Sequence, residues 1–320
     1  MIKTKNMKKT MYQKAVLAAS LFIALCAGCK KESKPQPPVQ GSTITDIVSS
    51  NASFSLLKTA VIKAGLATTL SSTGPFTVFA PSDTAFNGSG VGSSVIGALS
   101  GDKLKSILLY HTIPSKILAK DVPAGPNAKV VTAGGDSVFV TKNGAGVFVN
   151  GVPVTQADIL ASNGVVHAVA RVLMPPVGNL VQSVQADTSL TFLVAAVLRA
   201  SQGSADLATI LSSGGIFTVF APTNNAFRTA GFATTDAINA ANPDDLAAIL
   251  TYHAISGRIF SSDLSEGAQP VTVNGAKLTI SLSGGATVKG ISNSTGSNIT
   301  AANIVASNGV IHKIDQVLLP

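Results

Sequence analysis

Three ordered blocks of this sequence occur twice, and the duplication constrains the fold more than any other feature. FTVFAP stands at residues 76–81 and again, unchanged, at 217–222. The other two repeated blocks are LKSILLYH (104–111) with LAAILTYH (246–253), and ASNGVVH (161–167) with ASNGVIH (306–312). The copies are about 140 residues apart, a usual domain length. The repeats therefore predict two tandem domains with separate cores, not a solenoid of short units.

The N-terminal segment has the composition of a secretory signal. Five lysines precede the short apolar run AVLAASLFIALC (15–26), and the first acidic residue is Glu32. A basic flank, a short apolar core and small residues after it are typical of a signal peptide, and the run is too short to span a bilayer comfortably. LCAGC (25–29) resembles a bacterial lipoprotein signal, with cleavage before an acylated Cys29. We therefore predict a signal peptide at 1–28 and a membrane anchor through a lipid on Cys29.

The positive charge of the chain belongs mostly to this segment. The formal net charge is +8, and removing five signal lysines leaves +3 with no basic cluster, which argues against nucleic-acid binding. Cys26 and Cys29 form a C-x-x-C with no partner pair, so a redox or metal role is poorly supported. The polar, proline-rich residues 29–42 are predicted to form a semi-stiff tether. Lys30 after the anchor, by resemblance to Gram-negative lipoproteins, indicates an outer-membrane lipoprotein that faces the periplasm or the cell surface.

Residues 43–176 and 177–320 are the two predicted domains, and each shows helical patterns first and hairpin patterns later. FTVFAP indicates a buried strand, after which Ser82 and Thr223 can cap a short helix. Helices are predicted over 54–66 and 190–202 and over the segments that end near Tyr-His. The segment DSVFVTKNGAGVFVNGVPVTQADIL (136–160) alternates and turns at Asn-Gly, as hairpins do. This order predicts the α+β class.

The repeated blocks resemble the fasciclin-like domain. Its hallmarks are a first block of the FTVFAP type, a central Tyr-His pair, and a closing strand in which Asn-Gly, two apolar residues and His follow one another. Both repeats contain all three. The resemblance implies that each domain is a β-sandwich wedge with helices packed along one side, with FTVFAP as its central strand. In animal relatives the Tyr-His region is associated with integrin-dependent adhesion.

The four histidines occupy equivalent positions in the two repeats. His111 and His167 could join Asp83 in a two-histidine, one-carboxylate metal site. Against this, no ligand-spaced cluster such as H-E-x-x-H is present, and Asn224 replaces Asp83 in the second repeat. We therefore predict no metal and no cofactor. His167 and His312 are predicted to be structural, with ring nitrogens bonded to the backbone or to the turn at Asp83 or Asn224.

Two interpretations are open for the Tyr-His pairs, Tyr110-His111 and Tyr252-His253. They either pack at the end of an apolar helix face or contact a partner. The sequence has no G-x-S-x-G elbow, no phosphate-binding loop and only two glutamates, so an enzyme is not expected. We predict a tethered protein for adhesion or extracellular-matrix contact, with a protein or matrix partner. The alternatives are a glycan-binding accessory protein of a polysaccharide-uptake system and a periplasmic binder of a small apolar ligand.

Overall fold

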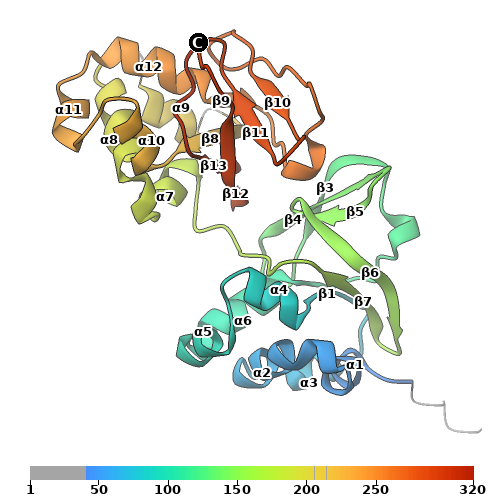
Figure 1. The fold of residues 1–320 in the computed structure, drawn as a ribbon. Helices are drawn as coiled ribbons and strands as arrows, with labels where there is room; N and C mark the ends of the chain where they lie inside the picture. Colours follow the sequence, from blue (N-terminus) through green and yellow to red (C-terminus); the bar gives the residue numbers. More distant parts are fainter. Residues whose placement is uncertain (1–40, 205, 214) are drawn as a thin grey trace, which may run out of the picture. The chain divides into compact units, whose positions relative to one another are not determined.

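The computed structural model of the protein describes residues 41–204, 206–213 and 215–320. The predicted signal peptide, the lipid site Cys29 and most of the tether lie outside the described residues. Figure 1 shows the elements. In residues 43–176 they are α1 (Ile44–Ser50), η1 (Ala52–Phe54), α2 (Ser55–Lys63), α3 (Ala67–Ser71), β1 (Phe76–Pro81), α4 (Asp83–Gly88), α5 (Ser93–Ala98), α6 (Gly101–Tyr110), β2 (Thr112–Ile113), η2 (Ala119–Asp121), β3 (Gly125–Val131), β4 (Ser137–Asn143), β5 (Gly146–Val149), β6 (Val152–Ala161) and β7 (Gly164–Val169).

The second repeat forms a similar series of elements with one strand fewer. They are α7 (Leu180–Gln185), η3 (Thr188–Leu190), α8 (Thr191–Ala200), α9 (Leu207–Ser213), β8 (Phe217–Pro222), α10 (Asn224–Thr229), α11 (Thr235–Asn239), α12 (Pro243–Tyr252), β9 (Ala254–Ser256), η4 (Ser261–Asp263), β10 (Thr279–Ser281), β11 (Thr287–Lys289), β12 (Ser297–Ala306) and β13 (Gly309–Ile314). Two short strands, β10 and β11, stand where the first repeat has β3, β4 and β5. We call the two series domain 1 and domain 2.

Short polar side chains set where several helices begin. Ser82 accepts a hydrogen bond from the Ala85 amide and caps α4, and Thr223 accepts one from the Ala226 amide and caps α10. Both caps agree with the sequence prediction, since a Ser or Thr oxygen satisfies an amide that has no partner inside the helix. None of the helices in the described ranges is long and apolar enough to cross a membrane.

Each domain contains one hydrogen-bonded sheet. Its strand order is β2-β1-β7-β6-β5-β4-β3 in domain 1 and β10-β11-β12-β13-β8-β9 in domain 2. The FTVFAP strands, β1 and β8, were expected at the centre but lie one place from an edge. The reason is that β1 pairs in parallel with the closing strand β7, while its other side is covered by only the two residues of β2 that follow α6. Domain 2 repeats this arrangement with β13, β8 and β9.

Alternate side chains of the FTVFAP strand and of the closing strand enter two different cores. In domain 1, Val78 and Val166 face the helices α1–α6, whereas Phe79 and Val169 face β4 and β5. This alternation follows from the period of two along a strand. The wedge implied by the family resemblance is thus a single sheet that curls over a core of its own, with helices covering its other face (Figure 1).

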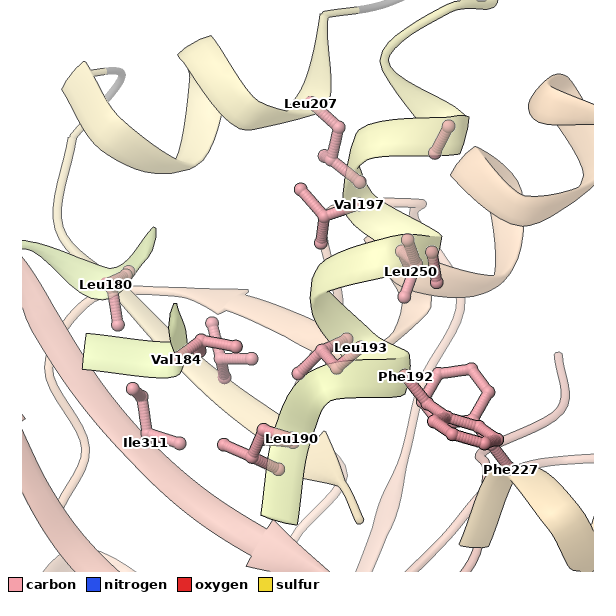
Figure 2. Packing of buried hydrophobic residues seen from close by; sticks show 14 of the residues in the cluster. Leu180, Val184, Leu190, Phe192, Leu193, Val197, Leu207, Phe227, Leu250 and Ile311 are labelled. Atoms are coloured by element: carbon pink, nitrogen blue, oxygen red, sulfur yellow. The ribbon is translucent and has the colours of Figure 1, made fainter. Parts of the chain in front are cut away.

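Domain 2 has the same two cores. On the helix side α8 supplies more buried residues than any other single element, and Phe192 packs on Phe227 with ring centroids 6.4 Å apart. Figure 2 shows side chains of α7, α8, α12 and β13 converging on this core. On the sheet side, Phe220, Leu278 and Ile280 are fully buried.

A glycine permits the close approach of the FTVFAP strand to the closing strand. A Cβ on Gly164 would lie 2.1 Å from the Phe76 carbonyl oxygen, and one on Gly309 would lie 2.2 Å from the Phe217 oxygen. No side chain fits there, because real Cβ atoms do not approach backbone oxygens so closely. This explains why both copies of the third block contain Asn-Gly.

Candidate functional site

The Tyr-His pairs lie at the ends of two equivalent helices. α6 ends at Tyr110 and α12 ends at Tyr252, and the following histidine is the C-cap of each helix. All four side chains are at most 1% exposed. A partner cannot reach these side chains in the folded state.

Each tyrosine hydroxyl has a donor and an acceptor within the fold. Tyr110 donates to the Ser137 carbonyl at 3.1 Å and accepts from the Asn150 side-chain amide at 2.9 Å. Burial raises the pKa of Tyr110 to about 12, so the hydroxyl keeps its proton near neutral pH. Tyr252 donates to the Lys277 carbonyl at 2.7 Å and accepts from the Ile291 amide at 3.0 Å.

The histidine of each pair connects the helix end to the segment that follows the closing strand. The Nδ1 atom of His111 is 2.8 Å from the Ile107 carbonyl, and its Nε2 atom accepts from the Leu173 amide at 2.9 Å. Because a backbone amide only donates, the ring must be neutral with its proton on Nδ1. Burial lowers the pKa of His111 to about 4, which agrees with this neutral form.

His253 makes the same connection in domain 2. Its Nδ1 atom lies 2.8 Å from the Ile249 carbonyl, and its Nε2 atom accepts from the Leu318 amide at 2.8 Å. Burial lowers its pKa to about 4 as well. Neither ring therefore has a nitrogen free for a substrate or a metal ion.

The closing-strand histidines bond to backbone carbonyls. The Nε2 atom of His167 is 2.8 Å from the Ile117 oxygen, and that of His312 is 2.9 Å from the Ile259 oxygen. The Nδ1 atom of His167 accepts from the Asp158 amide at 3.1 Å, whereas that of His312 has no partner among the described residues. Burial also lowers the pKa of His312.

Asp83 and Asn224 do not meet these histidines. Asp83 accepts from the Leu56 amide at 2.8 Å and from the Ser55 hydroxyl at 2.6 Å. Asn224 accepts from the Phe192 amide at 3.0 Å. Both residues therefore tie the short helix after the FTVFAP strand to the start of the preceding long helix. In the part of the chain that the structure describes, no three residues of the metal-ligating types gather into a site.

Two further polar residues of the repeated blocks have fold contacts that sequence reasoning missed. Thr77 donates to the Ser115 carbonyl at 2.6 Å and accepts from the Ile117 amide, and Thr218 has equivalent partners. The Asn163 side chain accepts from the Ile44 amide and donates to two carbonyls near the end of α3. The sequence alone could have indicated these residues, because the Thr and the Asn are identical in both copies of their blocks.

The comparisons with known proteins find the same duplication. The model of the fasciclin domain matches residues 52–175 and 190–320. Transforming growth factor-beta-induced protein ig-h3 of Sus scrofa is 28% identical over 254 residues, which cover 77% of this chain and 35% of that protein. Periostin of Homo sapiens is 30% identical, with 77% and 28% covered. This chain thus spans about a third of the length of these two relatives.

A bacterial relative matches less than half of the chain, and a solved structure matches most of it. Protein sll1483 of Synechocystis is 42% identical over 136 residues, 42% of this chain and 74% of that protein. The solved FAS1 domain pair of the insect cell adhesion molecule Fasciclin I is 21% identical with a TM-score of 0.39, covering 83% of this chain and 97% of that chain. Because the family model matches both repeats and more than half of the chain, this protein belongs to the fasciclin-domain family and carries two fasciclin domains in tandem.

Proposed function

We propose that the protein is a non-enzymatic, membrane-tethered cell-surface protein that works in adhesion or extracellular-matrix contact. The observation that carries this proposal is the match of the fasciclin model to both domains. One protein with such a domain pair is described as an insect cell adhesion molecule. The adhesion role is therefore transferred from the family, and the partner is a protein or a matrix component.

The contacts of the repeated polar residues support a role without catalysis. A general base needs a nitrogen or oxygen within reach of a substrate proton. The ring nitrogens of His111 and His253 are all hydrogen-bonded inside the fold, and both side chains are buried. The repeated Tyr, His and Asn side chains thus stabilise the fold within each domain. We assign partner contact to exposed residues that differ between the repeats.

Display at a membrane surface is the proposed mechanism. A lipid on Cys29 would anchor the chain in the outer membrane, and the tether of residues 29–42 would hold both domains away from that surface. Two domains on one chain raise the avidity for a surface that both can contact, because the second binding event becomes intramolecular.

Adhesion of coated beads tests the proposal. Beads that carry residues 43–320 should adhere saturably to a cell or matrix-protein surface, and beads that carry an unrelated protein should not. Tyr110→Phe and Tyr252→Phe each leave two backbone or side-chain amide groups, most of them partly buried, without their hydrogen-bond partner, which costs about 1–3 kcal/mol of stability. Below the melting temperature both variants should adhere as the wild type does.

The glycan-binding alternative gives a different result. The chain has no Trp, and its two domain tyrosines are buried, so the aromatic platform that commonly packs on sugar rings is not supplied by these residues. We expect no saturable heat of binding to soluble oligosaccharides. Saturable glycan binding without bead adhesion would replace the adhesion proposal with the glycan one.

A further inference from the structure

The helix-side core of domain 2 contains a cavity of about 40 Å³. Helices α7, α8 and α9 form its walls, and residues of β8, α12 and β9 form its floor. Figure 2 shows Leu180, Val184, Leu193, Val197 and Leu250 pointing toward this region from three helices. The walls are therefore aliphatic.

Polar groups contribute almost nothing to the lining. The two polar lining residues are Gln185 and His253. Gln185 is exposed on α7, and both ring nitrogens of His253 already have partners. A water inside an apolar cavity needs two to four polar partners, so this cavity favours an apolar guest over water.

The size of the cavity limits the shape of the apolar molecule that can enter it. A single water needs about 10–15 Å³, and a cavity of about 150 Å³ takes benzene. A cavity of about 40 Å³ is too small for a ring, but it accepts the end of an unbranched hydrocarbon chain.

An aliphatic rim leads from solvent to the cavity. Leu198 lines the cavity from α8 and is 53% exposed, and Val181 and Val194 line it while partly exposed. Methylene groups that lie along such a rim lose contact with water, which contributes about 0.8 kcal/mol for each fully buried group. No Lys, Arg, Asp or Glu is among the lining residues, so the polar end of the guest stays in solvent.

Domain 1 has polar residues at two of the three corresponding rim positions, and the third, opposite Leu198, is the exposed Ile62. The shared hydrogen bonds of Asn163 and Asn308, and of Asp83 and Asn224, align the two domains residue by residue. On this alignment Thr45 corresponds to Val181 and Lys58 to Val194. The Thr45 hydroxyl donates to the Ala67 carbonyl at 3.0 Å and thereby ties α1 to α3. In domain 2 a valine takes this place, so that tie is missing between α7 and α9.

We propose that domain 2 binds the aliphatic chain of an amphiphile, such as a fatty acid, with the chain end in this cavity and the next methylenes along Val181, Val194 and Leu198. This activity goes beyond adhesion and does not depend on it. Domain 1 does not bind such a chain, because Thr45 and Lys58 would have to give up polar contacts to an apolar guest.

Lauric acid below its micelle concentration is the probe. In methyl NMR spectra of residues 43–320, we expect saturable shifts of Leu193, Val197 and Leu250. The domain-1 counterparts Leu57, Val61 and Leu108 give an internal control and should not shift. Wild-type spectra in which none of the domain-2 methyls shifts saturably, or in which both sets shift alike, would overturn the proposal.

A pair of exchanged variants tests the rim. Val181→Thr with Val194→Lys gives domain 2 the residues of domain 1, and the affinity should fall at least ~10-fold because apolar contact area is lost. The matched control, Thr45→Val with Lys58→Val, should leave the affinity of domain 2 unchanged. A folded Val181→Thr, Val194→Lys protein that binds lauric acid as the wild type does would contradict the proposed site. If this variant does not fold, the wild-type methyl shifts decide alone.

Discussion

At the scale of single residues, the structure explains why the two repeats share particular polar side chains. Each shared Tyr or His bonds to backbone or amide groups that are far away in sequence, such as His111 to the Leu173 amide. The sequence predicted the positions of these residues and a structural role for His167 and His312. It could not identify their hydrogen-bond partners, because most of these are backbone atoms, which a pattern of side chains does not reveal. Their burial and their hydrogen bonds inside the fold favour packing over partner contact for both Tyr-His pairs.

The buried histidines make stability depend on pH. Burial lowers the pKa of His111 and His253 to about 4, whereas an unfolded chain has a value near 6.5. Between these values the unfolded state binds more protons than the native state, so the free energy of unfolding rises with pH. We expect the full contribution above about pH 6.5 and its progressive loss toward pH 4, by roughly 3 kcal/mol per histidine. Urea unfolding at a series of pH values measures this slope.

Glutamine at these two positions provides the control. His111→Gln with His253→Gln keeps a donor and an acceptor but removes the titrating rings. The variant should be less stable at pH 7 and should lose less stability between pH 6.5 and pH 4. An unchanged slope would show that other groups cause the pH dependence.

At the scale of elements, alternation and turn residues predicted the local structure well. Asn143-Gly144 and Asn150-Gly151 separate β4, β5 and β6 as expected, and the long helices α2, α6, α8 and α12 fall in the predicted segments. The parallel pairing of β1 with β7 was not predicted, because it joins Phe76 to Gly164 and no local pattern encodes such a distant partner. The position of β1 beside the edge follows from the same pairing.

The Asn of the third block connects helices to the closing strand. The Asn308 side chain accepts from the Leu180 amide at 2.8 Å and donates to the Leu211 carbonyl at 2.8 Å. It thus holds the start of α7 and the end of α9 together. Asn308→Ala should cost about 1–3 kcal/mol and should speed amide hydrogen exchange in α7 and α9 more than in β8.

Domain 1 offers the matched variant. Asn163 has the equivalent bonds to the Ile44 amide and the Leu70 carbonyl. Asn163→Ala should speed exchange in α1 and α3 and leave α7 and α9 unchanged. Faster exchange throughout the chain in either variant would mean that the effect is global unfolding rather than local release.

At the scale of the whole molecule, the duplication predicted two domains, and the resemblance of the repeated blocks predicted their family, which the family model confirms. The large hydrophobic clusters each draw residues from one repeat: two lie within residues 43–176 and two within 177–320. We therefore expect each half, expressed alone, to fold cooperatively with near-native circular dichroism. Halves that are unfolded while the whole chain is folded would show that the domains depend on each other.

The membrane anchor is the remaining whole-molecule prediction, and it concerns residues outside the described ranges. Buried lipid methylenes contribute about 0.8 kcal/mol each, so loss of the acyl group should release the protein from the membrane. Cys29→Ser should give a protein that incorporates no labelled fatty acid and stays in the aqueous phase of a detergent extract. Cys26→Ser is the matched control, since it changes a cysteine three places earlier and should leave acylation intact. If the Cys29 variant stays with the membrane and the wild type takes up no label, the lipoprotein hypothesis is wrong; if the Cys26 variant alone loses its label, the acylated residue is Cys26.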